Sequence, residues 1–103
     1  MSLNLPEPVA AYFAADLSYA DCFAEDAVVR DEGNTHNGRA AILQWRAESA
    51  RRFSYTSQPF AVEKAGEKWL VSSRVSGDFP GSPVELEYAF RLSDQQIVEL
   101  TIS

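Results

Sequence analysis

The strict alternation of apolar and polar side chains over residues 84–92 is the feature that most limits how this chain can fold. A period of two over such a stretch predicts a β-strand with one face in a core and the other toward water. The same alternation predicts strands over residues 54–63, from about Lys68 to Phe79, and over residues 97–102. The apolar members of the clearest strand are Val84, Leu86, Tyr88, Phe90 and Leu92.

Short turns separate these strands, which indicates hairpins between consecutive strands. Ala65-Gly66-Glu67 is the first predicted turn, Pro80-Gly81 has the residues of a type II turn, and residues 93–96 form the last. Pro59 lies inside the first long strand. It predicts a sheet edge or a bulge there, because proline has no N–H to donate to a neighbouring strand.

Two short helices are predicted near the N-terminus. The first begins near Asn4, which can cap it, with Pro6 and Glu7 in the first turn. The second begins at Ser18 and includes Phe23. The apolar stripe of the first helix is Val9, Tyr12 and Phe13.

A strand, a turn and the longest helix follow. The strand is predicted over residues 27–31 and the polar turn over residues 32–37. The helix is capped by Asn37 or Gly38 and runs to about Phe53. Its apolar stripe is Ile42, Trp45, Ser49 and Phe53, and its water-facing side includes Arg39 and Arg46.

Helices that precede a hairpin-linked sheet predict an α+β domain. Amphipathic helices must cover one face of a strongly twisted antiparallel sheet. Bends at Pro59 and Gly77 would let the sheet curve. We therefore expect a cone-shaped, curved antiparallel sheet wrapped around the long helix, with the N-terminal helices closing the cone.

Composition narrows the functional class. The chain has 103 residues and a formal net charge of −6, and we expect one domain over residues 1–103. The acidic balance argues against nucleic-acid binding. A single cysteine, Cys22, and a single histidine, His36, argue against a disulfide and against a metal cluster. Without a bilayer-length apolar run or a secretory signal, we expect a cytoplasmic protein that does not enter a membrane.

Asp31 is the residue that points to chemistry. Ala27, Val29 and Asp31 share one face of the predicted strand, so Asp31 faces the core if Val29 does. A carboxylate in an apolar pocket holds a proton more tightly and can act as a general base. The alternative is that Asp31 accepts backbone hydrogen bonds in the turn before Gly33.

Several stretches together resemble the SnoaL-like branch of the nuclear transport factor 2-like superfamily. They are Phe23-Ala-Glu-Asp-Ala-Val-Val, Asp31-Glu-Gly, Gly38-Arg-Ala-Ala-Ile with Trp45, and Val84-Glu-Leu-Glu-Tyr-Ala-Phe-Arg-Leu. The resemblance implies a curved sheet around a long helix, a deep apolar pocket, and commonly a homodimer packed through the sheet. It does not select a function, because this fold hosts isomerases, cyclases, hydrolases, dehydratases and non-catalytic modules.

The resemblance also implies roles for three residues. Asp31 occupies the strand position where ketosteroid isomerase, a member of this superfamily, keeps its proton-abstracting carboxylate. Tyr12 lies near that enzyme's phenol donor, and Tyr88 stands about where its second donor is a carboxylic acid. Both phenols could donate hydrogen bonds to an oxyanion beside Asp31. The alternative is that both are core aromatics.

The remaining candidates would surround a ligand. His36 could shuttle protons or touch a ligand at the pocket mouth, or be a solvated loop histidine. Neither a metal nor a cofactor is expected. The residues that would line the pocket, or equally fill it, are Val29, Trp45, Trp69 and Phe90.

Two functions from different classes therefore stay open. One is a cofactor-independent isomerase, cyclase or hydratase that acts on an apolar carbonyl compound, with Asp31 as base. The other is a non-catalytic ligand-binding or dimerisation module of the same fold, because the pattern gives Asp31 no second ionisable partner. The expected partners are an apolar small molecule and a second copy of the chain.

Overall fold

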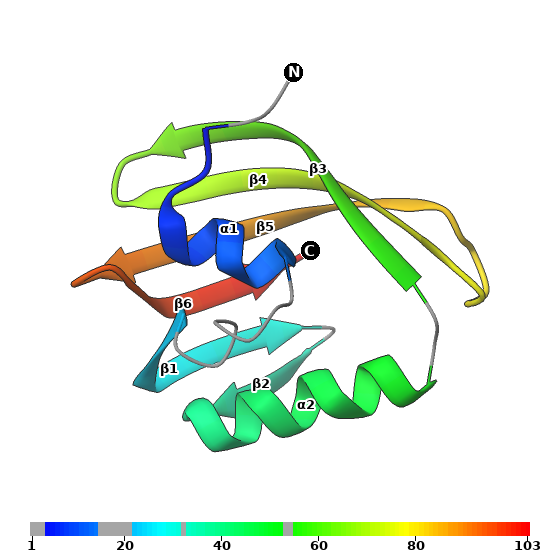
Figure 1. The fold of residues 1–103 in the computed structure, drawn as a ribbon, viewed down its shortest axis with the longest axis horizontal. Coiled ribbons are helices and arrows are strands. Elements are labelled where there is room, and N and C mark those ends of the chain that lie inside the picture. Colours follow the sequence, from blue (N-terminus) through cyan, green and yellow to red (C-terminus); the bar gives the residue numbers. More distant parts are fainter. Residues whose placement is uncertain (1–3, 15–21, 32, 53–54) are drawn as a thin grey trace.

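The computed structural model describes residues 4–14, 22–31, 33–52 and 55–103. These residues form two helices and one curved, six-stranded sheet, which is the α+β architecture that the sequence predicts (Figure 1). The elements are α1 (Glu7–Ala14), β1 (Phe23–Asp31), β2 (Asn34–Asn37), α2 (Arg39–Arg52), β3 (Tyr55–Ala65), β4 (Lys68–Gly77), β5 (Val84–Ser93) and β6 (Gln96–Ile102).

The strand order is β2-β1-β6-β5-β4-β3, so β2 and β3 form the two open edges. Four of the neighbouring pairs are antiparallel, but β1 and β6 run parallel. The expectation of a purely antiparallel sheet is therefore wrong for this one pair. The reason is that the chain between β1 and β6 contains a helix and four strands, so it crosses over instead of turning back as a hairpin.

The second half of the chain follows its alternation closely. One face of β4 and β5 is buried, including Val71, Tyr88 and Phe90, and we call this side of the sheet the inner face. Pro59 does mark a bulge on an edge strand, because the pairing of β3 with β4 shifts between Pro59 and Ala61. The type II turn at Pro80-Gly81 is also present: the N–H of Ser82 donates to the carbonyl of Phe79 at 3.3 Å, and Gly81 has a φ of 87°.

The first half departs from its predicted boundaries. Phe23 is the first residue of β1, where it pairs with Ile97, and is fully buried, so its assignment to a short helix is wrong. Pairing with a distant strand overrides the local capping pattern there. The rest of that predicted helix, residues 18–21, lies outside the described residues. Helix α1 begins at Glu7, because the carbonyl of Pro6 accepts from the N–H of Ala10 at 2.9 Å, so Asn4 is not its cap.

The predicted polar turn before α2 is mostly a strand. β2 pairs with β1 in an antiparallel hairpin, in which Asn34 lies opposite Asp31 and His36 opposite Val29. The sequence pattern does not predict β2 as a strand, because its residues are polar and an edge strand need bury little of its surface. Gly38 then caps α2 as predicted: its carbonyl accepts from the N–H of Ile42 at 3.0 Å, and its φ of 89° suits glycine.

The prediction that Arg39 faces water is wrong. Its Nε and Nη2 atoms donate to the carbonyl oxygen of Phe23 at 3.1 and 2.7 Å. Gln96 of β6 donates to the same oxygen at 3.4 Å. The guanidinium therefore joins the first turn of α2 to the start of β1, where the strand pairing is irregular.

Replacing Arg39 with methionine is expected to lower the free energy of unfolding by about 1.5–3 kcal/mol, because a partly buried carbonyl loses two charge-assisted hydrogen bonds. Urea unfolding followed by circular dichroism measures this loss. The matched control is Lys64→Met on the edge strand β3, where the side chain is exposed, and it should stay within about 0.5 kcal/mol of the wild type. Equal losses in both variants would contradict the role of Arg39.

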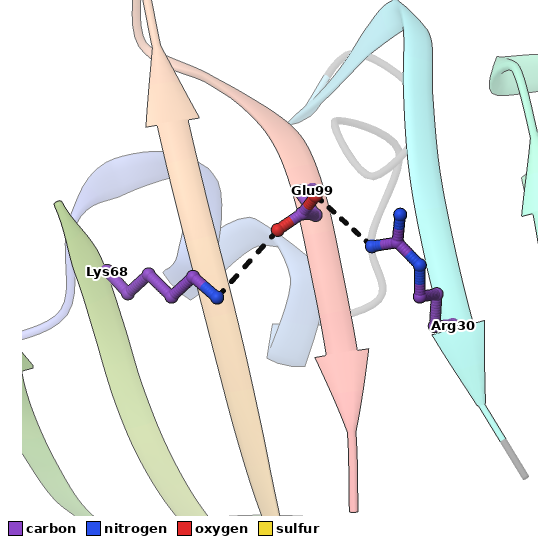
Figure 2. Close-up of polar contacts among 3 residues, drawn as sticks. All are labelled: Arg30, Lys68 and Glu99. Atoms are coloured by element: carbon purple, nitrogen blue, oxygen red, sulfur yellow. Dashed lines mark ion pairs between the residues drawn. The ribbon is translucent and has the colours of Figure 1, made fainter.

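The other face of the sheet, which we call the outer face, carries a charged network (Figure 2). Arg30 Nη1 lies 3.1 Å from Glu99 Oε2, and Lys68 Nζ lies 3.9 Å from Glu99 Oε1. The network links β1, β6 and β4. The hydrogen bond from Arg30 lowers the pKa of Glu99; partial burial opposes this shift, and the charges of Arg30, Arg91 and Lys68 add to it.

This lowered pKa makes the stability of the fold depend on pH in a defined direction. The folded pKa lies below the ordinary value of 4.5, so the ion pair stabilises the fold above that value and stops doing so as the pH falls through the folded pKa. Both cations are about half exposed, so Glu99→Gln should cost at most about 1 kcal/mol at pH 7. The cost should shrink near pH 2, measured by urea unfolding beside Glu87→Gln as control; a constant cost would contradict this account.

Candidate functional site

The strand register places Asp31 and Tyr88 on the inner face, two strands apart. Ile102 of β6 is the register partner of both residues. Directly opposed residues share a face, and strands lie about 4.8 Å apart, so the two Cα atoms are separated by about 10 Å. Val29 is fully buried on the same face, and Asp31, at the end of β1, is half-buried. The two strongest candidates from the sequence thus point to the same side of the sheet.

Helix α1 covers this face with aromatic rings, and it lies in front of the curved sheet in Figure 1. The ring centroid of Tyr12 lies 5.9 Å from that of Tyr88 and 5.4 Å from that of Phe90, both in edge-to-face geometry. Phe13 lies 5.1 Å from Tyr88 in the same kind of contact. Tyr12 and Tyr88 are buried and Phe90 is fully so. The three candidates Tyr12, Tyr88 and Phe90 therefore lie in one aromatic cluster.

Arg46 is a site residue that sequence reasoning missed. It was predicted to face water, but its guanidinium carbon lies 4.3 Å from the ring centroid of Tyr12, and its charge acts on the Tyr88 phenol. This is a cation–π contact, favourable for an arginine over a phenol ring. The signal was present in the spacing, because Arg39, Ile42 and Arg46 follow at i, i+3 and i+7, and Ile42 is fully buried.

A pair of serines was missed as well. Ser73 of β4 is completely buried, and its Oγ lies 2.6 Å from the Oγ of Ser57 on β3. Ser57 is also hydrogen-bonded to the hydroxyl of Tyr88. Alternation predicts which serines face inward, but it does not predict that two of them meet. Their contact depends on the register of β3 against β4, which shifts at the bulge.

Burial raises the pKa of Tyr88 above its ordinary value of 10.0. The hydrogen bond from Ser57 and the charge of Arg46 lower it, whereas Tyr55 and the carboxylate of Asp31 raise it further. The phenol therefore stays protonated at neutral pH and can act as a hydrogen-bond donor. Asp31 lies close enough for its charge to act on that phenol, so a carboxylate and a protonated phenol share one electrostatic environment.

The other candidates lie along the same face, on both sides of this cluster. His36 is in β2 and not in a loop, and it is half-buried and stacked on Trp45 at 5.2 Å between ring centroids. Trp69 is the register partner of Phe90, and Lys64 Nζ lies 5.6 Å from its ring centroid. The structure thus brings together Asp31, Tyr12, Tyr88 and Phe90 at the centre, with His36–Trp45 at one side and Trp69 at the other.

Among the hollows lined by described residues are two open surface grooves, and neither has Asp31, Tyr12 or Tyr88 in its wall. One, of about 650 Å³, is lined by Ser57, Gln58, Pro59, Phe60, Arg74 and Glu85. The other, of about 400 Å³, is lined by Lys64, Glu67, Trp69, Arg91, Leu92, Ser93 and Val98. Within the described ranges, no three histidine, cysteine or acidic side chains gather as metal ligands, and no helix has the length and apolarity to cross a membrane.

Similarity to known proteins comes from solved structures. No family model matches the chain, and no curated protein does. A provisionally assigned polyketide cyclase from Sinorhizobium meliloti is 42% identical, with 100% of this chain and 99% of that chain covered and a TM-score of 0.92.

Two further structures share the fold at lower identity. A hypothetical protein from Catenulispora acidiphila with a ketosteroid isomerase-like fold, solved with trimethylamine, is 21% identical over 97% of this chain and 86% of its own, with a TM-score of 0.83. A provisionally assigned SnoaL-like polyketide cyclase from Jannaschia sp. is 19% identical over 94% and 82%, with a TM-score of 0.75. At these identities the likeness shows the fold alone.

Proposed function

The chain belongs to the SnoaL-like branch of the nuclear transport factor 2-like superfamily, and we propose that it is a cofactor-independent enzyme that moves a proton on an apolar carbonyl compound. Asp31 is the proposed base and Tyr88 the proposed donor. The observation that carries the proposal is that both lie on the inner face, near enough for the Asp31 charge to act on the Tyr88 phenol. The polyketide cyclase assignment of the Sinorhizobium meliloti protein agrees with a carbonyl-rich substrate.

In the proposed reaction, the carboxylate of Asp31 removes a proton from the carbon next to the carbonyl group. The electron pair of the broken C–H bond moves to the carbonyl oxygen, which becomes an enolate oxyanion. Tyr88 donates a hydrogen bond to this oxyanion, and the positive charge of Arg46 stabilises it. Return of the proton to another carbon gives an isomerase. Attack by the enolate carbon on a second carbonyl carbon of the substrate gives a cyclase, because the C=O π electrons move to that oxygen, which takes up the proton held by Asp31.

The other candidates have supporting roles in this proposal. Tyr12 holds the Arg46 guanidinium against its ring and offers a second phenol hydroxyl. Val29 and Phe90 form an apolar floor, because both are fully buried on the inner face. Trp69 extends that floor beside Phe90, and the stacked pair His36–Trp45 bounds the opposite side.

Proton exchange tests the proposal without knowledge of the final product. Apolar ketones are first selected for binding through the fluorescence of Trp45 and Trp69. Each ligand that binds is then incubated with the protein in D₂O, and loss of its α-proton signal is followed by NMR. We expect exchange faster than in buffer alone. A ketone that binds with its carbonyl beside Tyr88 and does not exchange would overturn the enzyme proposal.

A second candidate function is a non-catalytic ligand-binding or dimerisation module. It is favoured by the close packing of Tyr12 and Phe13 against Tyr88 and Phe90, which occupies the centre of the inner face. A ligand that contacts Tyr88, which is only 6% exposed, must displace part of this ring layer. Binding without proton exchange is the result that would select this function.

We also propose that two copies pair through the outer face, in a cytoplasmic setting. Arg74 and Glu85 are register partners on neighbouring strands there, and Leu70 and Ala89 between the charged rows are half-buried. In a two-fold dimer each charge can meet its opposite on the other copy. Light scattering should give about twice the chain mass of 11.4 kDa.

A further inference from the structure

We propose that Ser73 and Ser57 form a hydroxyl relay that sets the direction in which Tyr88 donates its hydrogen. In this relay Ser73 donates to Ser57, Ser57 donates to the oxygen of Tyr88, and the phenol hydrogen points toward Asp31 and a bound ligand. The functional consequence rests on the proposed role of Tyr88 as donor. The relay itself does not require that the protein be an enzyme.

The buried end of the relay is Ser73. It is the one polar side chain that is fully buried among the described residues, with 0% of its surface exposed. Its register partners, Pro59 and Leu86, have no hydrogen-bonding group in their side chains. An unsatisfied hydroxyl in such surroundings is costly. The Oγ–Oγ distance of 2.6 Å to Ser57 is at the short end for hydroxyl pairs, so Ser73 is well satisfied by this one partner.

The direction of the relay follows from counting hydrogens. Each hydroxyl has one hydrogen to donate and can accept as well. If Tyr88 donated to Ser57 and Ser57 to Ser73, the hydrogen of Ser73 would find no acceptor on the side chains of its register partners, Pro59 and Leu86. In the opposite direction every serine hydrogen is used, and the phenol hydrogen is left for the site.

The charges around Tyr88 favour the same direction. The carboxylate of Asp31 attracts the phenol hydrogen, and the guanidinium of Arg46 acts on the oxygen. The hydrogen bond from Ser57 lowers the pKa of Tyr88 against the raising effect of burial, as a donor to the phenol oxygen should. Hydroxyls in a chain polarise one another, so the relay makes Tyr88 a stronger donor.

Titration of Tyr88 tests the relay in the protein without any ligand. Tyrosine labelled with ¹³C at Cζ gives one signal per residue, and Tyr88→Phe assigns the signal of Tyr88. The decisive variant is Ser73→Ala, which should raise the pKa of Tyr88 because Ser57 loses its polarising donor. Ser73→Thr keeps the hydroxyl and should restore the wild-type titration. Ser72→Ala, on the opposite face of the same strand, is the matched control and should change nothing.

Each other outcome rejects the proposal. A lower pKa of Tyr88 in Ser73→Ala would mean that Ser73 competes for the hydrogen of Ser57, and that the relay runs the other way. An unchanged pKa would mean that no relay exists. If Ser73→Ala does not fold, Ser73→Cys replaces the hydroxyl with the weaker S–H donor and must raise the pKa of Tyr88. Proton exchange is measured separately, so a relay without exchange rejects the proposed function alone, and exchange without the predicted shift rejects the relay alone.

Discussion

Replacing Asp31 with asparagine is expected to slow proton exchange of a bound ketone by about 10²- to 10⁴-fold, the usual contribution of a positioned general base. Asparagine keeps the size of the side chain but cannot accept the substrate proton. Asp31 is half-buried at the end of β1, so the change leaves the fully buried Val29 and Leu100 untouched. The measurement is the rate of deuterium incorporation at saturating ketone.

The matched control lies in the same strand. Asp26 is exposed, and Asp26→Asn makes the same chemical change away from the inner face. Its exchange rate should equal that of the wild type. Full activity in Asp31→Asn, with unchanged circular dichroism, would show that another group accepts the proton and would remove the central element of the proposed mechanism.

Replacing Phe90 with alanine is expected to lower the free energy of unfolding by about 3–5 kcal/mol. Phe90 is fully buried, stacks on Tyr88 with ring centroids 6.2 Å apart, and meets the edges of Tyr12 and Phe13. The variant loses the burial of the ring and leaves a cavity beneath α1. Such a loss is a large part of the 5–15 kcal/mol that is usual for a domain. Urea unfolding measures it.

Phe60→Ala is the matched control. It also replaces a phenylalanine with alanine, but at a position in β3 where 52% of the side chain is exposed. It should cost no more than about 0.5 kcal/mol. If Phe90→Ala were equally mild, the ring layer would be loosely packed. The close packing of Tyr12 and Phe13 against Tyr88 and Phe90 would then no longer support a non-catalytic module.

The sequence predicted the second half of the fold well, for a simple reason. In β5 the alternation from Val84 to Leu92 reports burial directly, because neighbouring side chains of a strand point to opposite faces. Glycine and proline mark the turns of hairpins locally, as at Pro80-Gly81. The first half was harder, because Phe23 is in a strand only through its pairing with the distant Ile97.

The site was predicted in part. The alternation of side chains along the strand predicted that Asp31 lies on the same face as Val29. The resemblance to the SnoaL-like branch indicated Tyr12 and Tyr88. Arg46 was missed because a charged residue on a helix was assigned to water, although its long side chain can cross an aromatic ring. Ser57 and Ser73 were missed because their contact depends on the bulge near Pro59, whose exact register no local pattern gives.

The parallel pairing of β1 with β6 has a consequence for how the protein acquires its structure. Pairs such as Val29 with Leu100 join segments that are synthesised far apart in time, and such non-local contacts slow folding. In the sheet, Ile102 of β6 is the register partner of both Asp31 and Tyr88, so these two residues come into register through β6. We therefore expect the hairpins from β3 to β5 to form early, and the proposed base Asp31 to come into register with the proposed donor Tyr88 late in folding.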